Sequence, residues 1–307
     1  MKGQVIKSTG SWYEVKTANG EVLRSRLRGK FRTEGIKVNN PIAVGDWVEA
    51  EKEEANKKAA LITKIYDREN YLIRKSTRKK GFSHILASNL DQTLLIATLT
   101  FPRTSLGFID RFLVSAESFR IPSIVVFNKA DLLEKSDRQY VQELMEMYRA
   151  LDYSAFLISA EQETGLRELK QSLEGKTTLI AGHSGVGKST LLNKLIPNLD
   201  QKTGEVSTFA NKGTHTTTFA EMFELNAQTK IIDTPGIKEL GLVDMAGTEI
   251  SHYFPEMRAY LGSCKYNDCT HTNEPGCAVL EALVRGEISE SRFNSYLSIL
   301  EDHDSHR

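Results

Sequence analysis

The stretch Thr177-Thr-Leu-Ile-Ala-Gly-His-Ser-Gly-Val-Gly-Lys-Ser-Thr-Leu-Leu-Asn-Lys-Leu-Ile196 holds an apolar run, a glycine-rich turn and a second apolar run in close succession. Residues 177–181 are β-branched or apolar and favour a buried strand, whereas residues 190–196 favour a helix. The three glycines between them allow the backbone to fold its N–H groups around an anion. A helix that begins directly after such a turn adds its dipole to the attraction. The stretch therefore predicts an α/β fold built around a phosphate-binding loop.

The glycine-rich turn also supplies side chains for the phosphates of a nucleotide and for a magnesium ion. Lys188 would bring a positive charge to the β- and γ-phosphates, and the Ser189 hydroxyl can ligate Mg²⁺. His183 is a candidate acid or base, with a loop histidine of no chemical role as the alternative. A glycine-rich turn without any ligand is the alternative for the whole motif. The predicted phosphate contacts are Gly182, His183, Ser184, Gly185, Val186, Gly187, Lys188, Ser189 and Thr190.

A base-recognition motif is indicated by Asn128-Lys129-Ala130-Asp131, which follows the apolar run 124–127. In open α/β sheets, ligands bind beyond the carboxyl ends of the strands. Asp131 can accept hydrogen bonds from N1–H and the 2-amino group of guanine, Asn128 can face O6 and N7, and the stem of Lys129 can pack on the ring. Adenine lacks these two donors, so the motif favours GTP over ATP. The same residues also favour a surface turn, which is the alternative.

A helper element for the base is predicted at Ser159-Ala160, directly after the apolar run 155–158. The two residues carry no information alone. Their position at the end of another predicted strand would allow a backbone N–H to meet O6 of guanine. We therefore count Ser159 and Ala160 among the predicted nucleotide-binding residues.

A γ-phosphate switch is predicted at Asp233-Thr-Pro-Gly236, which follows the apolar run 230–232. Asp233 would hold Mg²⁺ through water, and the N–H of Gly236 would sense the γ-phosphate. A simple turn is the alternative. The next residue, Ile237, can neither donate nor accept a hydrogen bond, whereas Ras-like enzymes place a water-orienting glutamine there. We therefore expect slow intrinsic hydrolysis and a partner that orders the attacking water.

A second switch is predicted in the polar segment 204–218, where one threonine would complete the Mg²⁺ shell. The spacing favours Thr217, with Thr216 nearly as suitable. His215 is a candidate for orienting water or transferring a proton, with a loop histidine of no chemical role as the alternative. The predicted catalytic residues are Lys188, Asp233 and His215, and the predicted magnesium ligands are Ser189, Thr217 and Asp233.

The order of these motifs differs from that of an ordinary GTPase, in which the phosphate loop comes first. Here the base-recognition motif at 128–131 precedes the phosphate loop at 182–190. The chain is therefore similar to a circularly permuted GTPase. GTP or GDP with Mg²⁺ is the predicted ligand.

A separate metal site is predicted from Cys264, Cys269, His271 and Cys277. Three thiolates and one imidazole form the ligand set of a closed tetrahedral zinc site, which leaves no open position for catalysis. All three cysteines of the chain lie in this segment. A disulfide would leave one thiol over and would be unusual in a cytosolic protein, so it is the weaker alternative. We predict one structural Zn²⁺, with an amphipathic helix near residues 293–300 packed on its module.

The amino-terminal region shows short runs of alternating or β-branched residues and no clear helical period. Asn19-Gly20 between two of these runs is a strong hairpin signal. Five short strands of this kind favour an OB-type barrel. The runs lie at 3–7, 12–15, 22–27, 46–49 and 61–66.

The net charge of zero hides an uneven distribution. Residues 1–80 contain 19 Lys and Arg against 10 Asp and Glu, and the remainder contains 21 against 30. A basic barrel predicts a partner with a phosphate backbone and an affinity that falls with salt, although a solvated charged face is the alternative. Alternating cations that would share one face of a strand are Arg24, Arg26, Arg28, Lys30 and Arg32.

The length of 307 residues, of which 40% are hydrophobic, suffices for one large α/β core and two small domains. We predict a barrel at residues 1–72, a permuted GTPase domain at 73–245 and a mainly helical zinc-binding domain at 246–307. No apolar run reaches membrane-spanning length, and the first residues do not resemble a signal peptide. We therefore expect a soluble, cytoplasmic protein without a membrane partner, with a monomer as the default.

The complete set of motifs resembles the RsgA family of small-ribosomal-subunit biogenesis GTPases. The resemblance covers essentially the whole chain and rests on the barrel, the permuted motif order, Gly-x-His-Thr-Thr-Thr and the spacing Cys-x₄-Cys-x-His-x₅-Cys. It implies a late-acting assembly factor that binds the small subunit and its rRNA near the decoding region. It also implies that the subunit stimulates GTP hydrolysis, which serves release. Nucleotide contacts would fall on 128–131 and 182–190, and zinc on the Cys and His residues named above.

Two other functions remain consistent with the residues alone. The chain could be an RNA-binding regulator in which GTP is a structural ligand. It could instead act on a different RNA particle, such as the large subunit or a messenger RNA. A basic barrel does not discriminate between these possibilities.

Overall fold

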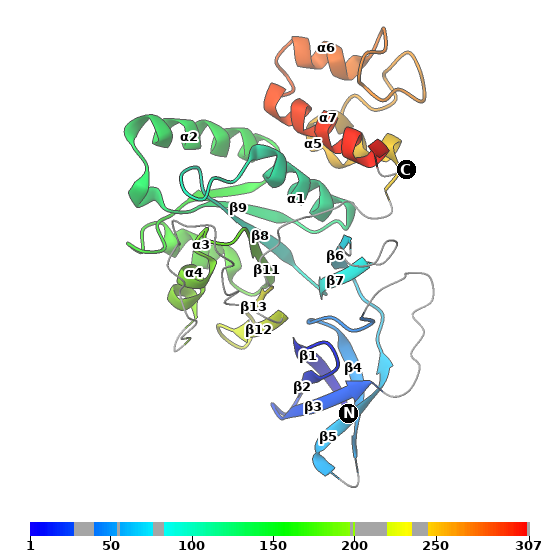
Figure 1. Cartoon of the computed structure of the whole chain (residues 1–307), viewed down its shortest axis with the longest axis vertical. Helices are drawn as coiled ribbons and strands as arrows, with labels where there is room; N and C mark the ends of the chain where they lie inside the picture. The colour runs from blue at the N-terminus through cyan, green and yellow to red at the C-terminus, as the bar shows by residue number, and fades with distance from the viewer. Residues whose placement is uncertain are drawn as a thin grey trace.

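The computed structural model describes residues 1–27, 40–53, 56–75, 83–196, 199, 220–234 and 245–305. The described chain forms three modules in a row, with a barrel at one end, an α/β domain in the middle and a helical module at the other end (Figure 1). This arrangement confirms the predicted fold class. The exact domain boundaries stay a prediction.

The amino-terminal module is a closed barrel of five described strands. These are β1 (Lys2–Ser8), β2 (Tyr13–Thr17), β3 (Val22–Leu27), β4 (Trp47–Glu53) and β5 (Asn56–Ile65). They pair in the order β1–β2–β3–β5–β4 and back to β1, and all pairs are antiparallel except β3–β5. The hairpin predicted at Asn19-Gly20 is present: Gly20 has a φ of +82°, and its N–H donates to the carbonyl of Thr17 at 2.9 Å. The predicted OB-type barrel is confirmed.

The central module is a sheet of six described strands with helices on both faces. The strands are β8 (Gln92–Ala97), β9 (Ser123–Phe127), β10 (Ser154–Leu157), β11 (Thr177–Gly182), β12 (Ala220–Glu224) and β13 (Lys230–Asp233). The helices are α1 (Leu106–Ser118), α2 (Lys135–Ala150), α3 (Leu166–Leu173), α4 (Lys188–Leu195) and the short 3₁₀ turn η1 (Ala130–Leu132). The strand order is β10–β9–β8–β11–β13–β12, and only β12 runs antiparallel to its neighbour β13.

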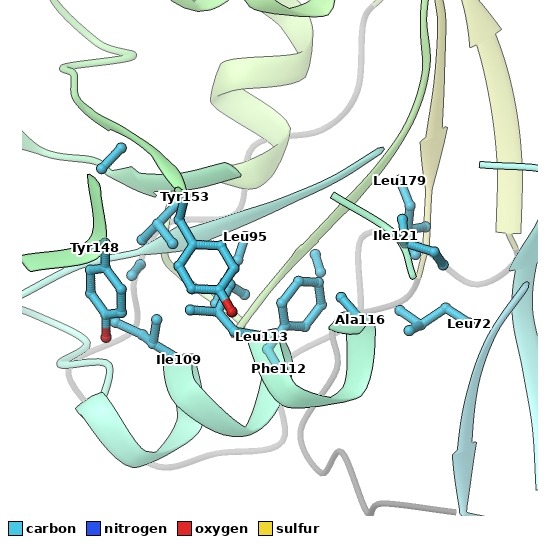
Figure 2. Close-up of a cluster of buried hydrophobic side chains, with 14 of the residues drawn as sticks. Leu72, Leu95, Ile109, Phe112, Leu113, Ala116, Ile121, Tyr148, Tyr153 and Leu179 are labelled. Carbon is cyan, nitrogen blue, oxygen red and sulfur yellow. The ribbon is translucent and has the colours of Figure 1, made fainter. Parts of the chain in front are cut away.

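Both faces of this sheet are buried, which explains why its central strands are almost continuously apolar. Leu95 of β8 packs with α1 and α2, whereas its neighbour Leu94 packs with α3 and α4. Figure 2 shows Ile109 and Phe112 of α1 directed toward the sheet, close to Leu95. Helices packed on both faces of the sheet thus fix the positions of its strands, including their carboxyl ends.

The barrel and the central sheet are hydrogen-bonded to each other. β12 pairs with β1 in an antiparallel register that places Glu221 opposite Lys7. Ion pairs Lys7–Glu221 (2.9 Å) and Lys16–Glu224 (2.5 Å) accompany this junction. A separate two-stranded hairpin, β6 (Tyr71–Lys75) and β7 (Ser83–Ser88), leads from the barrel to the central domain (Figure 1).

The carboxyl-terminal module is helical. It contains η2 (Gly247–Tyr253), α5 (Pro255–Arg258), α6 (Ala278–Val284) and α7 (Glu290–Ser305). The amphipathic helix predicted near 293–300 lies within α7, whose Phe293, Tyr296 and Leu300 are buried in the core of the module. Across the described ranges, none of the helices combines the length and the apolar character that crossing a membrane requires.

Candidate nucleotide site and metal cluster

The predicted nucleotide motifs meet at one edge of the central sheet. β8, β9, β10, β11 and β13 are parallel neighbours, so their carboxyl ends lie together. The motifs at 128–131, 159–160, 182–190 and 233–234 each begin at or just after one of these ends. Segments that are far apart in the sequence are therefore side by side here.

The phosphate loop has the backbone shape that an anion requires. Gly185 and Gly187 adopt φ angles of +85° and +92°, in the region that favours glycine. Gly187 caps α4, so the free N–H groups of the first turn of this helix lie beside the loop. A Cβ on Gly187 would lie only 2.3 Å from Nδ2 of Asn128. The loop can thus hold phosphate groups against the positive end of α4.

Asn128 links the phosphate loop to the base-recognition region. Its Nδ2 donates to the carbonyl of Val186 (2.9 Å), and its Oδ1 accepts from the N–H of Ala160 (3.0 Å). The sequence predicts that Asn128 and the Ala160 N–H contact guanine, whereas in this arrangement they bind each other. Asn128 thus connects three motifs through hydrogen bonds. The sequence does not predict these contacts, because they form only where the ends of three strands meet.

Lys129 and Asp131 are also fixed by neighbours. Lys129 has a left-handed φ of +68°, and its Nζ donates to the carbonyl of Phe101 at 2.8 Å. Burial lowers the pKa of Lys129, and the charge of Asp131 opposes this effect. The carboxylate of Asp131 accepts a hydrogen bond from the Ser159 hydroxyl. The sequence did not reveal Phe101, whose backbone position depends on the loop after β8.

Lys188 contacts the predicted magnesium-binding residue directly. Its Nζ lies 2.6 Å from Oδ1 of Asp233 and also donates to the carbonyl of Thr234. Ser189 follows Lys188 in the first turn of α4. Hydroxyl and carboxylate oxygens are the donors that Mg²⁺ prefers, so Ser189 and Asp233 fit this ion chemically. The sequence does not single out Thr234, because the motif assigns a role to Asp233 and the contact of Thr234 with Lys188 is made by the backbone carbonyl.

His183 lies against an aromatic ring. The ring centroids of His183 and Phe108 are 3.8 Å apart, with an interplanar angle of 35°. Burial lowers the pKa of His183 below its ordinary value, which favours the neutral imidazole. Phe108 belongs to the first turn of α1, so this stack connects α1 to the phosphate loop. The proposed acid or base role of His183 stays a prediction.

Several predicted residues cannot be placed in the site. The switch candidates lie outside the described ranges, as does the second half of the Asp-x-Pro-Gly motif. These residues are His215, Thr216, Thr217, Gly236 and Ile237. Their roles remain predictions from the sequence.

The four predicted zinc ligands converge into one cluster in the carboxyl-terminal module. The ligand atoms of Cys264, Cys269, His271 and Cys277 all lie within 4.8 Å of one another. Two thiolates bound to a tetrahedral zinc at about 2.3 Å would be about 3.8 Å apart. The Sγ atoms of Cys264 and Cys277 are 3.8 Å apart, and Nδ1 of His271 lies 3.5 and 3.4 Å from them. This donor set and its spacing fit a tetrahedral metal ion.

The loop that carries His271 is held by a carboxylate. Glu274 accepts hydrogen bonds from the N–H groups of Thr270, Thr272 and Asn273 and from the Thr270 hydroxyl. Burial raises the pKa of Glu274, but these hydrogen bonds outweigh it and hold the pKa at about 2. All three cysteines are free, so the alternative of a disulfide is not realised.

Comparison with protein families matches the barrel and the central domain, and the carboxyl-terminal module lies outside both matches. A model described as RsgA GTPase matches residues 65–243. A second model, described as RsgA N-terminal domain, matches residues 2–61. The two matches cover the central sheet and the barrel in the order in which the structure shows them.

Similar proteins match over almost their full lengths. "Small ribosomal subunit biogenesis GTPase RsgA 2" of Bacteroides thetaiotaomicron is 51% identical over 98% of this chain and 97% of the relative. The RsgA protein of Cytophaga hutchinsonii is 50% identical over 100% of both chains. Among solved structures, YjeQ from Thermotoga maritima has a TM-score of 0.77 and 35% identity, covering 98% of this chain and 97% of its own. YloQ, described as a circularly permuted GTPase, has a TM-score of 0.74 and 30% identity, covering 100% and 96%.

Proposed function

This chain belongs to the RsgA family and is a GTP-hydrolysing enzyme, and we propose that it acts in the biogenesis of the small ribosomal subunit. One observation carries the proposal. The base and phosphate motifs and Asp233, the first residue of the predicted γ-phosphate switch, meet at a single sheet edge in a chain that is about half identical, over nearly its full length, to relatives named for this role. The permuted motif order agrees with the description of YloQ.

The residues at the sheet edge would divide the reaction between them. Asp131 would read guanine, while the N–H groups of the phosphate loop and the charge of Lys188 would bind the β- and γ-phosphates. Ser189 and Asp233 would hold Mg²⁺, which neutralises developing charge when bound. His215, Gly236 and Thr217, with Thr216 as the alternative to Thr217, remain the proposed switch residues. Ile237 supports slow hydrolysis until the small subunit orders the attacking water.

The two flanking modules would supply contacts with RNA. Arg24 and Arg26 are exposed on β3, and Arg24 lies over the ring of Trp12 at 4.4 Å. Such a surface suits a phosphate backbone. Arg28, Lys30 and Arg32, which extend the predicted row, lie outside the described ranges. The barrel would bind rRNA while GTP is present, and hydrolysis would release the protein from the subunit.

Zinc in the carboxyl-terminal module would be structural. Cys264, Cys269, His271 and Cys277 would together occupy all four positions of a tetrahedral ion. No position would remain for water or substrate, so this metal would stabilise the loop at 262–277 and take no part in GTP hydrolysis.

The decisive experiment is GTP turnover by the purified protein with and without small ribosomal subunits. Large subunits and bare RNA serve as controls, and Lys188→Ala shows whether turnover comes from this site. We expect selective stimulation by small subunits. Equal stimulation by large subunits or bare RNA would move the target to another particle. Subunit binding that depends on GTP but not on turnover would favour a regulator in which GTP is structural.

A further inference from the structure

Lys188 and Asp233 form an ion pair that is shielded from water. The distance between Nζ and Oδ1 is 2.6 Å, and the two side chains are 10% and 0% exposed. A buried carboxylate is unfavourable unless a cation lies beside it. The ammonium of Lys188 supplies that cation here, and the carbonyl of Thr234 accepts a second hydrogen bond from it.

Both partners of this ion pair have other tasks in the proposed nucleotide site. Lys188 is expected on the β- and γ-phosphates, and Asp233 is expected on the hydrated magnesium ion. The single ammonium of Lys188 cannot contact the buried carboxylate of Asp233 and the phosphates of the nucleotide equally closely at the same time. The contact in this structure and the contacts of the loaded site are therefore alternatives.

Thr234 supplies a second, independent observation. Thr234 is 1% exposed, and its Oγ1 is buried without a hydrogen-bond partner from any residue that the structure describes. Leaving a buried hydroxyl without a partner costs free energy, so such a group points to a ligand in another state. Thr234 directly follows Asp233, and its carbonyl already faces the Lys188 ammonium. Carboxylate, carbonyl and hydroxyl oxygens are suitable partners for Mg²⁺ or for its bound water.

We propose that Lys188 is the cation of the magnesium position whenever no nucleotide is bound, and that Thr234 belongs to this position together with Asp233. The inference rests on the proposed function, because it takes this sheet edge as the GTP site. Lys188 leaves Asp233 only when phosphates are present to receive its charge. Asp233 and Thr234 then offer their oxygens to the divalent ion. Nucleotide and divalent ion therefore bind with positive cooperativity. Without nucleotide, Lys188 occupies the ion position, so the divalent ion does not bind there alone.

Thermal unfolding of the full-length, nucleotide-stripped protein with its zinc retained tests this exchange. Lys188→Met removes the ammonium beside Asp233 and should lower the melting temperature by about 5 °C or more. Millimolar MgCl₂ alone should recover most of that loss, because Mg²⁺ replaces the missing cation. The wild type should not respond to MgCl₂ beyond an NaCl control of equal ionic strength. Lys129→Met is the matched control, since Lys129 lies in the same site but contacts the Phe101 carbonyl, and it should not respond either.

Thr234 is tested by the isosteric change Thr234→Val. In the Lys188→Met background it should reduce the recovery by MgCl₂. In the wild-type background it should raise the melting temperature of the nucleotide-free protein, because it removes a buried hydroxyl that has no partner among the described residues. An unchanged recovery, or a lower melting temperature of the single variant, would remove Thr234 from the site.

Mn²⁺ binding to the wild type, measured by electron paramagnetic resonance, needs no variant. We expect one bound Mn²⁺ with GDP and none without it. Equal Mn²⁺ binding in both samples, or equal stabilisation of wild type and Lys188→Met by MgCl₂, overturns the inference. Normal GDP binding alongside either result refutes only this inference. Failure of the wild type to bind GDP in the presence of Mg²⁺ refutes the proposed nucleotide site itself.

Discussion

Gly187 and Asn128 fit together so closely that the glycine position has no room for a side chain. Gly187 has a φ of +92°, and a Cβ there would lie 2.3 Å from Nδ2 of Asn128. Asn128 cannot move away without a cost in free energy, because its side-chain amide hydrogen-bonds to both the Val186 carbonyl and the Ala160 N–H. Backbone conformation and contact therefore both require glycine at this point of the phosphate loop.

We predict that Gly187→Ala weakens GDP binding by about tenfold or more, since left-handed strain and displacement of Asn128 together cost on the order of 1–3 kcal/mol. Gly175→Ala is the matched control, because Gly175 has a φ of +71° but nothing lies within 4 Å of its added Cβ. The control should lower the melting temperature and leave GDP affinity unchanged. Fluorescence titration with labelled GDP measures the difference, and wild-type affinity in Gly187→Ala would contradict the prediction.

At the scale of elements, α7 is attached to α1 by a buried ionic network. Arg292 of α7 lies 2.7 Å from Asp110 of α1 and 2.7 Å from Glu256 of α5, and Tyr148 of α2 also donates to Asp110. Burial alone would lower the pKa of Arg292, but the two carboxylates raise it above its ordinary value. Networks of this kind fix an orientation more than they add stability. They set the carboxyl-terminal module on the helix whose first turn touches His183.

Removing Arg292 should be far more costly than removing an exposed arginine. Arg292→Met leaves Asp110 and Glu256 buried without this cation and should destabilise the protein by about 3–5 kcal/mol. Arg285 pairs with Glu287 at the surface, where both side chains are about half exposed, so Arg285→Met should leave the urea midpoint close to that of the wild type. Urea unfolding of both variants measures the contrast. Similar midpoints for the two would show that the buried network does not hold the module.

The loop that carries the four predicted zinc ligands, residues 262–277, should depend on bound zinc for its ordered conformation. We predict about one zinc per chain in the wild type and a loss of at least tenfold in zinc affinity for Cys264→Ser, because one of four ligands is removed. Residues 262–277 should then exchange their amide hydrogens faster. Lys265→Ala changes the neighbouring exposed residue and should retain zinc. Metal analysis with hydrogen exchange tests this, and full zinc content in Cys264→Ser would exclude the four-ligand site.

At the scale of the whole molecule, charge and connectivity are divided between the modules. The excess of cations lies in residues 1–80, and the remainder is acidic. Strand β12 connects the two parts, because it pairs with β1 of the barrel on one side and with β13 on the other. β13 ends at Asp233, so the barrel is hydrogen-bonded to the strand pair that carries this predicted magnesium ligand.

Binding to the small subunit should depend on salt through the exposed cations of β3. We predict that the double variant Arg24→Ala/Arg26→Ala binds more weakly at all salt concentrations and shows a log–log salt slope reduced by about 2, one for each lost phosphate contact. A double variant of exposed lysines on α3 and α4, Lys170→Ala/Lys194→Ala, should behave like the wild type. Equilibrium binding between about 50 and 200 mM salt measures both slopes. An unchanged slope for the β3 variant would place the RNA contacts elsewhere.

Features that depend on residues close together in the sequence were predicted, whereas contacts between residues far apart in the sequence were not. The strand, glycine turn and helix of residues 177–196, the hairpin at Asn19-Gly20 and the convergence of the Cys and His residues follow from local patterns, and each lies where the sequence predicts it. The contact of Lys188 with Asp233 joins residues 45 positions apart, and Arg292 reaches Asp110 across 182 positions. No local pattern encodes such pairs. The roles of the individual nucleotide residues stay predictions, because they concern a ligand.

The sequence by itself determined the three-module fold, the permuted order of the GTP-binding motifs and the four residues of the metal cluster. Period, turn chemistry and ligand spacing carry this information within short windows of the chain. Only the tertiary structure decided that Asn128 connects three motifs, that Lys188 contacts Asp233 and the carbonyl of Thr234, that the Thr234 hydroxyl is buried without a partner among the described residues, and that β12 connects the barrel to the sheet. These features arise where parallel strand ends and separate modules meet, and their free energy depends on burial and exact distances that no single segment specifies.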